Sequence, residues 1–301
     1  MNRQVQIVEV GPRDGLQNEK KPLSAEFKLE LIQKLEECGV SEIEVTSMVH
    51  PKWVPQLADA STLLNRLKAY PEKATRTVLV PNVKGLERAL EFDVKRVAVF
   101  IAASESFSQK NTNRSIEKSL EDTEAVVSLA LGKGLSVRAY LSTVFVCPFE
   151  GDVAPQLGSE LTRKLLDMGC DQVSLSDTIG AAVPEDLDAL LAELEGVDRQ
   201  KLALHLHDTY GTALANVTRG LDRGIRVFDS SVGGAGGCPY APGATGNLAT
   251  EDLLYLLDRG GWEHGIDRAK LMGAADFLEK GIGRTCTSHS LAIERARALS
   301  K

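Results

Sequence analysis

Two histidines two residues apart, His205 and His207, are the side chains in this sequence best spaced for chemistry. They lie in the run Leu202-Ala203-Leu204-His205-Leu206-His207-Asp208. Successive side chains of a β-strand point to opposite faces, so the leucines share one face and the two imidazoles share the other. Such a pair predicts a metal site, because neutral imidazole is a common metal ligand. Two hydrogen-bonded histidines at a strand end are the alternative.

Charged side chains follow or interrupt other apolar runs. Arg13 and Asp14 lie in Gly11-Pro12-Arg13-Asp14-Gly15-Leu16-Gln17, directly after the apolar run Gln4–Val10. An Arg-Asp pair in a turn is, however, often a plain salt bridge. In the run Glu42–Thr46, Glu44 alternates with apolar residues. If the strands close into a barrel, as argued below, its side chain points inside. A buried carboxylate needs a partner, and Arg13 is the candidate.

Further polar groups belong to later runs. Arg138 and Tyr140 share one face of a strand, and Asp177 and Thr178 end another. The alternatives are a structural salt bridge for Arg138 and a helix N-cap for Asp177 or Thr178. The glycine-rich segment 233–247 carries Cys238 and Asn247.

One carboxylate, two imidazoles and one amide oxygen would form a mixed nitrogen and oxygen ligand set, from Asp14, His205, His207 and Asn247. That set suits Mg²⁺, Mn²⁺, Co²⁺ or Zn²⁺. With a coordination position left open, the ion could polarise a carbonyl and stabilise an alkoxide. The predicted chemistry is carbon-carbon bond chemistry next to a carbonyl.

Eight short β-rich runs alternate with helical patterns and position these groups. The runs are Gln4–Val10, Glu42–Thr46, Arg76–Val80, Arg96–Ile101, Ser136–Thr143, Gln172–Ser176, Leu202–His207 and Val227–Ser231. A repeated strand-helix unit predicts an α/β fold, a (β/α)8 TIM barrel with its active site at the carboxyl ends of the strands. A doubly wound sheet is the alternative, but no G-x-G-x-x-G motif follows the first run.

Helical patterns fill the intervals between these runs. They are Ser24–Cys38, Gln56–Leu67, Val83–Phe92, Ile116–Leu131, Ser159–Met168, Pro184–Leu194 and Thr212–Arg223. We predict one catalytic domain over 1–301, with the barrel at about 4–256 and extra C-terminal helices at about 257–297 that cap or flank it.

Composition narrows the function further. A hydrophobic fraction of 43% with 26% charged residues is ordinary for a globular protein, and no apolar run is long enough to span a membrane. A net charge of -7 argues against a nucleic-acid surface, so the expected partner is a small molecule. Five scattered cysteines without a C-x-x-C pair indicate free thiols and a cytoplasmic location.

The motifs together resemble 3-hydroxy-3-methylglutaryl-CoA lyase. The resemblance runs from about Val5 to Leu257, on Gly11–Glu19, Pro51–Gln56, His205–Gly211 and Gly237–Ala241. The part most specific to the lyases is the Cys238 loop through Gly246–Asp252. It implies a metal-dependent lyase that cleaves 3-hydroxy-3-methylglutaryl-CoA to acetyl-CoA and acetoacetate, as in leucine degradation and ketone-body formation. It also implies Mg²⁺ or Mn²⁺, with Co²⁺ or Zn²⁺ possible, held by Asp14, His205, His207 and Asn247.

The same resemblance implies roles for single residues. Arg13 would stabilise the departing enolate and Cys238 would transfer a proton, with a packing thiol as the alternative for Cys238. Catalytic support is expected from Glu44 and Asp177, and substrate contacts from Arg13, Gln17, Tyr140 and Glu251. Lys110, Asn111 and Arg114 are candidates for contacting CoA, and we expect a homo-oligomer.

One departure from the family pattern concerns substrate size. This chain has Ser47-Met48-Val49-His50 where many members have Ser-Phe-Val-Ser, so a longer-chain 3-hydroxy-3-alkylglutaryl-CoA remains an alternative substrate. His50 could equally be a solvated surface residue.

Two further functions compete with cleavage. One is condensation, by a synthase of the isopropylmalate or citramalate type, and the other is a catalytically silent barrel that binds a metal or an acyl-CoA. The synthases usually carry an extra regulatory domain, for which 301 residues leave no room. A silent barrel would lack at least one ligand or Cys238, and none of these is missing.

Overall fold

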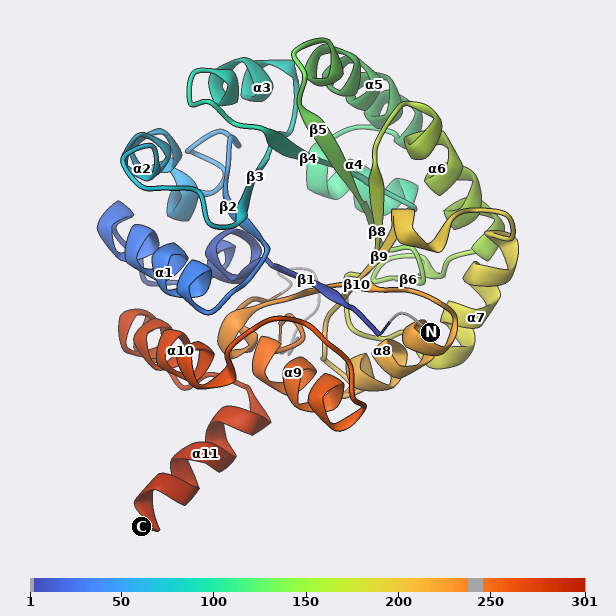
Figure 1. The fold of residues 1–301 in the computed structure, drawn as a ribbon. Helices are drawn as coiled ribbons and strands as arrows, with labels where there is room; N and C mark the ends of the chain where they lie inside the picture. The colour runs from blue at the N-terminus through green and yellow to red at the C-terminus, as the bar shows by residue number, and fades with distance from the viewer. Residues whose placement is uncertain (1–2, 238–245, 301) are drawn as a thin grey trace.

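Eight parallel strands close into a barrel in the computed structural model, which describes residues 3–237 and 246–300 (Figure 1). The barrel strands are β1 (Gln6–Glu9), β2 (Glu42–Ser47), β3 (Thr75–Leu79), β4 (Arg96–Ala102), β5 (Ser136–Ser142), β8 (Gln172–Asp177), β9 (Leu202–Leu206) and β10 (Val227–Ser230). Their order around the barrel is β1-β10-β9-β8-β5-β4-β3-β2, and β1 also pairs with β2. The predicted (β/α)8 barrel is confirmed, and each predicted run overlaps one barrel strand, with ends that differ by at most two residues.

Helices surround the barrel. They are α1 (Ala25–Glu37), α2 (Ala60–Leu67), α3 (Val83–Leu90), α4 (Glu105–Thr112), α5 (Ile116–Gly132), α6 (Pro155–Asp167), α7 (Pro184–Glu193), α8 (Ala213–Asp222), α9 (Thr250–Arg259), α10 (Arg268–Ile282) and α11 (His289–Leu299). Short helical turns are η1 (Gly11–Gly15), η2 (Pro55–Leu57), η3 (Arg199–Lys201) and η4 (Val232–Gly234). The outer helices overlap the predicted patterns, although α6 begins at Pro155 rather than Ser159. The extra C-terminal helices are α10, which lies on the outside of the barrel beside α1 and α9, and α11, which points away from the barrel (Figure 1).

Local chemistry sets the limits of α1. Ser24 caps the helix by accepting a hydrogen bond from the Phe27 N–H, and Gly39, at φ +91°, ends it in a conformation that residues with a Cβ rarely adopt. The leucines of α1 point inward, since Leu31 and Leu35 are fully buried against the barrel. The predicted helix over Gln56–Leu67 is corrected in part, because η2 and α2 divide it.

Two features were not predicted. Strands β6 (Val146–Cys147) and β7 (Gly151–Asp152) form a small antiparallel hairpin after β5, and α4 follows β4 before α5 begins. Both lie in segments that follow barrel strands and are too short to show a clear periodicity in the sequence. No helix within 3–237 or 246–300 has the length and apolarity needed to cross a membrane.

The alternation of β9 has the predicted consequence. Leu202, Leu204 and Leu206 belong to the large core between barrel and helices, and Leu204 lies so close to α8 that a Cβ on Gly220 would be 2.7 Å from it. Ala203 belongs instead to a small cluster with Val8, Val10 and Val227. The two histidines therefore point into the barrel.

Candidate metal centre and active site

The turn η1 carries Arg13 and Asp14 from the end of β1 to the barrel mouth. The N–H groups of Arg13, Asp14 and Gly15 converge on the Val10 carbonyl at 2.8 to 3.2 Å, which winds the chain into one wide π-helical turn. Such turns are frequent at functional sites. Here the turn presents a guanidinium and a carboxylate side by side.

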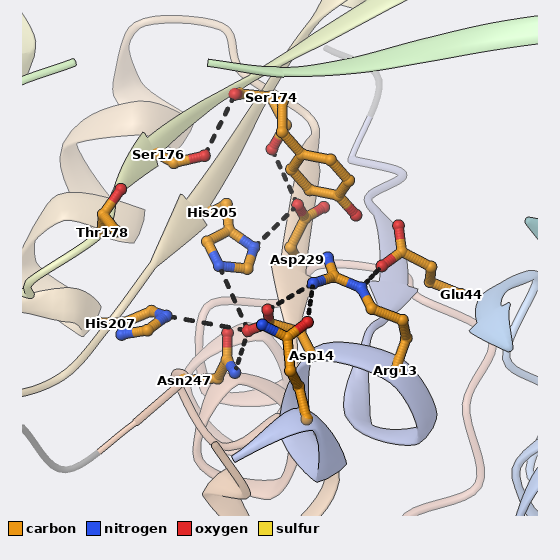
Figure 2. Close-up of polar contacts among 12 residues, drawn as sticks. Arg13, Asp14, Glu44, Ser174, Ser176, Thr178, His205, His207, Asp229 and Asn247 are labelled. Carbon is orange, nitrogen blue, oxygen red and sulfur yellow. Dashed lines mark hydrogen bonds and ion pairs between the residues drawn. The ribbon is translucent and has the colours of Figure 1, made fainter. Parts of the chain in front are cut away.

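The predicted metal ligands lie together (Figure 2). The Nε2 atoms of His205 and His207 are each 3.9 Å from Asp14 Oδ2, and one ligand atom from each of these three residues lies within 4.8 Å of the others. Asn247 Nδ2 donates to Asp14 Oδ2 at 2.8 Å, so a ligand oxygen from Asn247 would require the amide to turn over. The structure thus brings the four predicted ligands to one place.

The protonation states of this cluster suit a cation. Burial alone would raise the pKa of Asp14, but the charges of Arg13 and the two histidines, with the Asn247 hydrogen bond, hold it well below its usual range. Burial, together with repulsion from His205, lowers the pKa of His207 to about 4, so its ring is neutral at pH 7. His207 Nδ1 is buried and has no hydrogen-bond partner among the described residues. An anionic carboxylate beside neutral imidazole is a donor set that binds divalent cations.

Arg13 lies between two carboxylates. Its guanidinium pairs with Glu44 through Nε and with Asp14 through an Nη1 contact of 2.6 Å, and it lies over the Tyr140 ring at 5.6 Å. Nη1 also donates to Gln17 Oε1 at 3.4 Å. Burial alone would lower the pKa of Arg13, but the charges of Glu44 and Asp14 outweigh this effect and raise the pKa above its usual value. Arg13 therefore keeps its charge. The predicted Arg13–Glu44 pair is confirmed.

Glu44 and Tyr140 complete the wall behind Arg13. Glu44 is fully buried, and burial raises the pKa of its carboxyl although Arg13 offsets part of the rise. The Tyr140 ring meets the His205 ring edge-on at 5.7 Å. Gln17, Glu44 and Tyr140 therefore lie around the predicted ligands, as expected from the sequence.

Two predicted site residues bind backbone instead. Asp177 accepts from the N–H groups of Ala181 and Ala182, each at 3.0 Å, and burial raises its pKa to about 6 despite these bonds. Neither Asp177 nor Thr178 caps α7, whose N-cap is Val183, so that alternative is wrong. Both remain outside the cluster, and a catalytic part for Asp177 stays a prediction.

Glu251 is the second of these residues. It is fully buried, accepts from the Gly233 N–H at 2.9 Å, and burial raises its pKa to about 8. Its carboxylate holds η4, which leads into the segment before Asn247. A substrate contact for Glu251 stays a prediction, and Cys238 lies outside the described residues.

Other candidates have contacts of their own. The Lys110 ammonium lies 3.5 Å from the centre of the Phe149 ring, and Arg114 pairs with Asp122 at 2.9 Å. His50 Nδ1 accepts from the Lys52 N–H at 3.3 Å, which supports its surface-turn alternative. The contacts of Lys110 and Arg114 to CoA stay predictions, as does that of Asn111.

Sequence reasoning missed Asp229 and Glu9. Asp229 in β10 contacts His205 Nδ1 at 3.2 Å and also pairs with Arg138. Glu9 in β1 accepts from the N–H groups of Gly11 and Val232. The available signal was a carboxylate that follows two apolar residues within a predicted strand.

The fold and the site together define a (β/α)8 barrel enzyme with a histidine-carboxylate cluster at its mouth. Residues 4–278 match the family model described as HMGL-like, and the chain belongs to this family. The mitochondrial hydroxymethylglutaryl-CoA lyase of Macaca fascicularis is 48% identical over 287 residues, covering 95% of this chain and 88% of the relative. The cytoplasmic 3-hydroxy-3-methylglutaryl-CoA lyase of Rattus norvegicus is 47% identical, covering 94% and 83%.

A solved structure agrees with these relatives. The hydroxymethylglutaryl-CoA lyase of Pseudomonas aeruginosa superposes with a TM-score of 0.93 at 46% identity, covering 99% of each chain. The resemblance expected from the motifs is confirmed.

Proposed function

We propose that this protein cleaves 3-hydroxy-3-methylglutaryl-CoA to acetyl-CoA and acetoacetate. The observation that carries the proposal is the convergence of Arg13, Asp14, His205 and His207 at the mouth of a barrel whose sequence is 48% identical to a lyase of that name. Cleavage of the C2–C3 bond needs two things that the cluster can provide. One is a place for a cation next to the C3 oxygen, and the other is a fixed positive charge for the departing enolate.

The metal would be held by Asp14, His205, His207 and the Asn247 oxygen. The mixed nitrogen and oxygen set is compatible with Mg²⁺, Mn²⁺, Co²⁺ and Zn²⁺, and the family resemblance favours Mg²⁺ or Mn²⁺. When bound, a divalent cation supplies Lewis acidity to the hydroxyl and carboxylate oxygens of the substrate. Asp14 supplies the negative charge, and its depressed pKa keeps it ionised for that purpose.

Arg13 and Cys238 would act on the departing group. A base removes the C3 hydroxyl proton, the C3 oxygen becomes the ketone oxygen of acetoacetate, and the C2–C3 electron pair passes to the thioester enolate. Arg13 stabilises this enolate with a guanidinium that stays protonated. The Glu44 carboxylate holds Arg13 in place by pairing with the Nε atom of the guanidinium. Cys238 then gives a proton to C2, which releases acetyl-CoA.

A cleavage assay tests the function. Purified protein is stripped with a chelator, reloaded with Mg²⁺ or Mn²⁺, and given 3-hydroxy-3-methylglutaryl-CoA or analogues with longer 3-alkyl groups. We expect metal-dependent acetyl-CoA and acetoacetate from the methyl compound. Faster turnover of a longer analogue would transfer the proposal to that substrate, and absence of acetyl-CoA from all of them would remove the lyase function.

Cys238→Ala tests the proton donor. We expect turnover to fall by about two or more orders of magnitude, with the far-ultraviolet circular dichroism spectrum unchanged. Cys170→Ala is the matched control, because Cys170 precedes β8 and so lies at the opposite end of the barrel. Near-normal turnover in Cys238→Ala would exclude this thiol from the mechanism.

We also propose a single cytoplasmic TIM-barrel domain that assembles as a homo-oligomer, with an acyl-CoA as its small-molecule partner. The four described cysteines are free and buried, which supports a reducing compartment. The family match is continuous from barrel to α10, which supports one domain. Light scattering of the purified protein and localisation of a tagged copy test the assembly and the location.

A further inference from the structure

Asp229 lies between a predicted metal ligand and a buried cation. Its Oδ2 is 3.2 Å from His205 Nδ1 and accepts from Ser174 Oγ at 2.8 Å (Figure 2). Its Oδ1 pairs with Arg138. Asp229 and Arg138 are both essentially inaccessible to solvent. Side chains from three other strands, β5, β8 and β9, therefore contact this carboxylate.

Arg138 is held in the barrel by other contacts as well. Its Nε donates to Gln172 Oε1 at 2.7 Å and its Nη1 to the Tyr140 hydroxyl at 3.0 Å. A buried guanidinium stays protonated and can only donate, so it requires an acceptor at Asp229 Oδ1. The orientation of the Asp229 carboxylate is thereby fixed.

We propose that Asp229, held by Arg138, is the positioning residue that fixes the tautomer of His205 for metal binding. This proposal rests on the proposed function, because it concerns the same metal centre. A carboxylate paired with a guanidinium only accepts hydrogen bonds, so His205 Nδ1 must carry the proton. A neutral imidazole has one N–H, which leaves the Nε2 lone pair directed toward Asp14, 3.9 Å away.

His207 offers a comparison within the same site. Its Nδ1 has no hydrogen-bond partner among the described residues, so no protein group there selects its tautomer. His205 is thus the ligand that the protein orients in advance. Groups that orient a ligating histidine in this way typically change metal affinity 10- to 100-fold when removed.

Asp229→Asn makes an unusually sharp test. Arg138 can only donate, so the amide oxygen of the new residue must face the guanidinium and its NH₂ group must face His205. His205 Nδ1 then accepts, and the proton moves to Nε2, where it blocks coordination. We expect the tautomer to invert and the Mn²⁺ affinity to fall about 10- to 100-fold.

The tautomer is read directly from ¹⁵N spectra of histidine-labelled protein without metal, with the His205 signals assigned by their loss in His205→Gln. Wild-type protein should show a protonated Nδ1 and an unprotonated Nε2, and Asp229→Asn the reverse. Calorimetric titration with Mn²⁺ gives the affinity. Ser174→Ala is the control, since it removes a donor to the same oxygen without imposing a new donor on His205, and it should lose less affinity.

A protonated Nε2 in wild-type His205 would overturn the proposal, even if Asp229→Asn did not fold. Unchanged tautomer and Mn²⁺ affinity in Asp229→Asn would overturn it as well. Both readouts are independent of turnover. A lyase with an unaltered tautomer would refute only the role of Asp229, and a protein without lyase activity would refute only the proposed function.

Discussion

Arg13 is the residue on which the charges of this site depend. It separates Glu44, which is fully buried, from Asp14, which faces the two histidines. Without a cation between them, two neighbouring carboxylates would repel each other at low solvent exposure. Arg13 therefore both stabilises this pair of carboxylates and supplies the positive charge that the proposed reaction requires.

Arg13→Lys should separate these two duties. Lysine keeps the charge but cannot contact Glu44 and Asp14 with a planar fork. We expect kcat to fall by about 10²- to 10³-fold, the loss typical of a missing donor to a developing oxyanion. The Mn²⁺ affinity should change much less, which calorimetric titration checks. A variant with normal kcat would contradict the placement of Arg13 beside the reacting carbons.

The residue types of the site could be predicted better than their partners. Strand alternation placed His205, His207 and Glu44 inside the barrel, because a period of two is a property of the chain itself. Asp229 escaped notice because its partners, His205 and Arg138, are distant in sequence and meet it only when the closed barrel brings β5, β9 and β10 together. Asp177 and Glu251 were assigned to the site by position alone, and the side-chain direction that sends them to backbone N–H groups cannot be read from their place in the sequence.

At the scale of the elements, loops decide how closely the ligands approach. Gly180, after β8, has φ +65°, and a Cβ there would be 2.6 Å from the Thr209 nitrogen and 2.8 Å from the His207 carbonyl. The backbone next to a predicted ligand is thus supported directly by the neighbouring loop. Neither this contact nor the π-helical turn of η1 has a local sequence signal beyond the glycine itself.

Gly180→Ala should disturb the metal centre through the backbone. The methyl group collides with backbone atoms and the positive φ disfavours alanine, so we expect a lower melting temperature and weaker Mn²⁺ binding. Gly273→Ala is the matched control. Gly273 lies within α10 with open space around it, and alanine there should stabilise the protein by about 1 kcal/mol. Unaltered Mn²⁺ binding in Gly180→Ala would show that the two loops move independently.

At the scale of the whole molecule, Glu9 ties together the place where the barrel closes. Its carboxylate accepts from Gly11 in η1, from Val232 in η4 and from the Thr250 hydroxyl at the start of α9. The strand count and order could be predicted because each strand-helix unit has its own signals. This brace could not, because it joins segments from both ends of the chain.

Glu9→Gln should change how stability depends on pH. Burial raises the pKa of Glu9 from 4.5 to about 7, although three hydrogen bonds offset part of the rise. A raised pKa gives stability that is present below pH 4.5 and is lost as the pH rises through about 7. Wild type should therefore lose up to about 3 kcal/mol relative to Glu9→Gln between pH 5 and pH 8.

Urea unfolding at pH 5 and pH 8 measures this difference. Glutamine can keep the contacts, because its oxygen accepts from both N–H groups while its NH₂ donates to Thr250, whose hydroxyl turns toward Ser230 at 2.9 Å. Glu30→Gln on the exposed side of α1 is the control. Parallel pH profiles for wild type and Glu9→Gln would show that Glu9 stays ionised in the fold.

Barrel closure also determines when, during translation, the predicted metal ligands come together. Asp14 and Asn247 are 233 positions apart, yet they hydrogen-bond to each other across the pairing of β1 with β10. A ribosome-bound chain therefore carries its first ligand long before it can present the last. Since domains generally fold as units during translation, nascent chains and early termination products should not bind metal at this site.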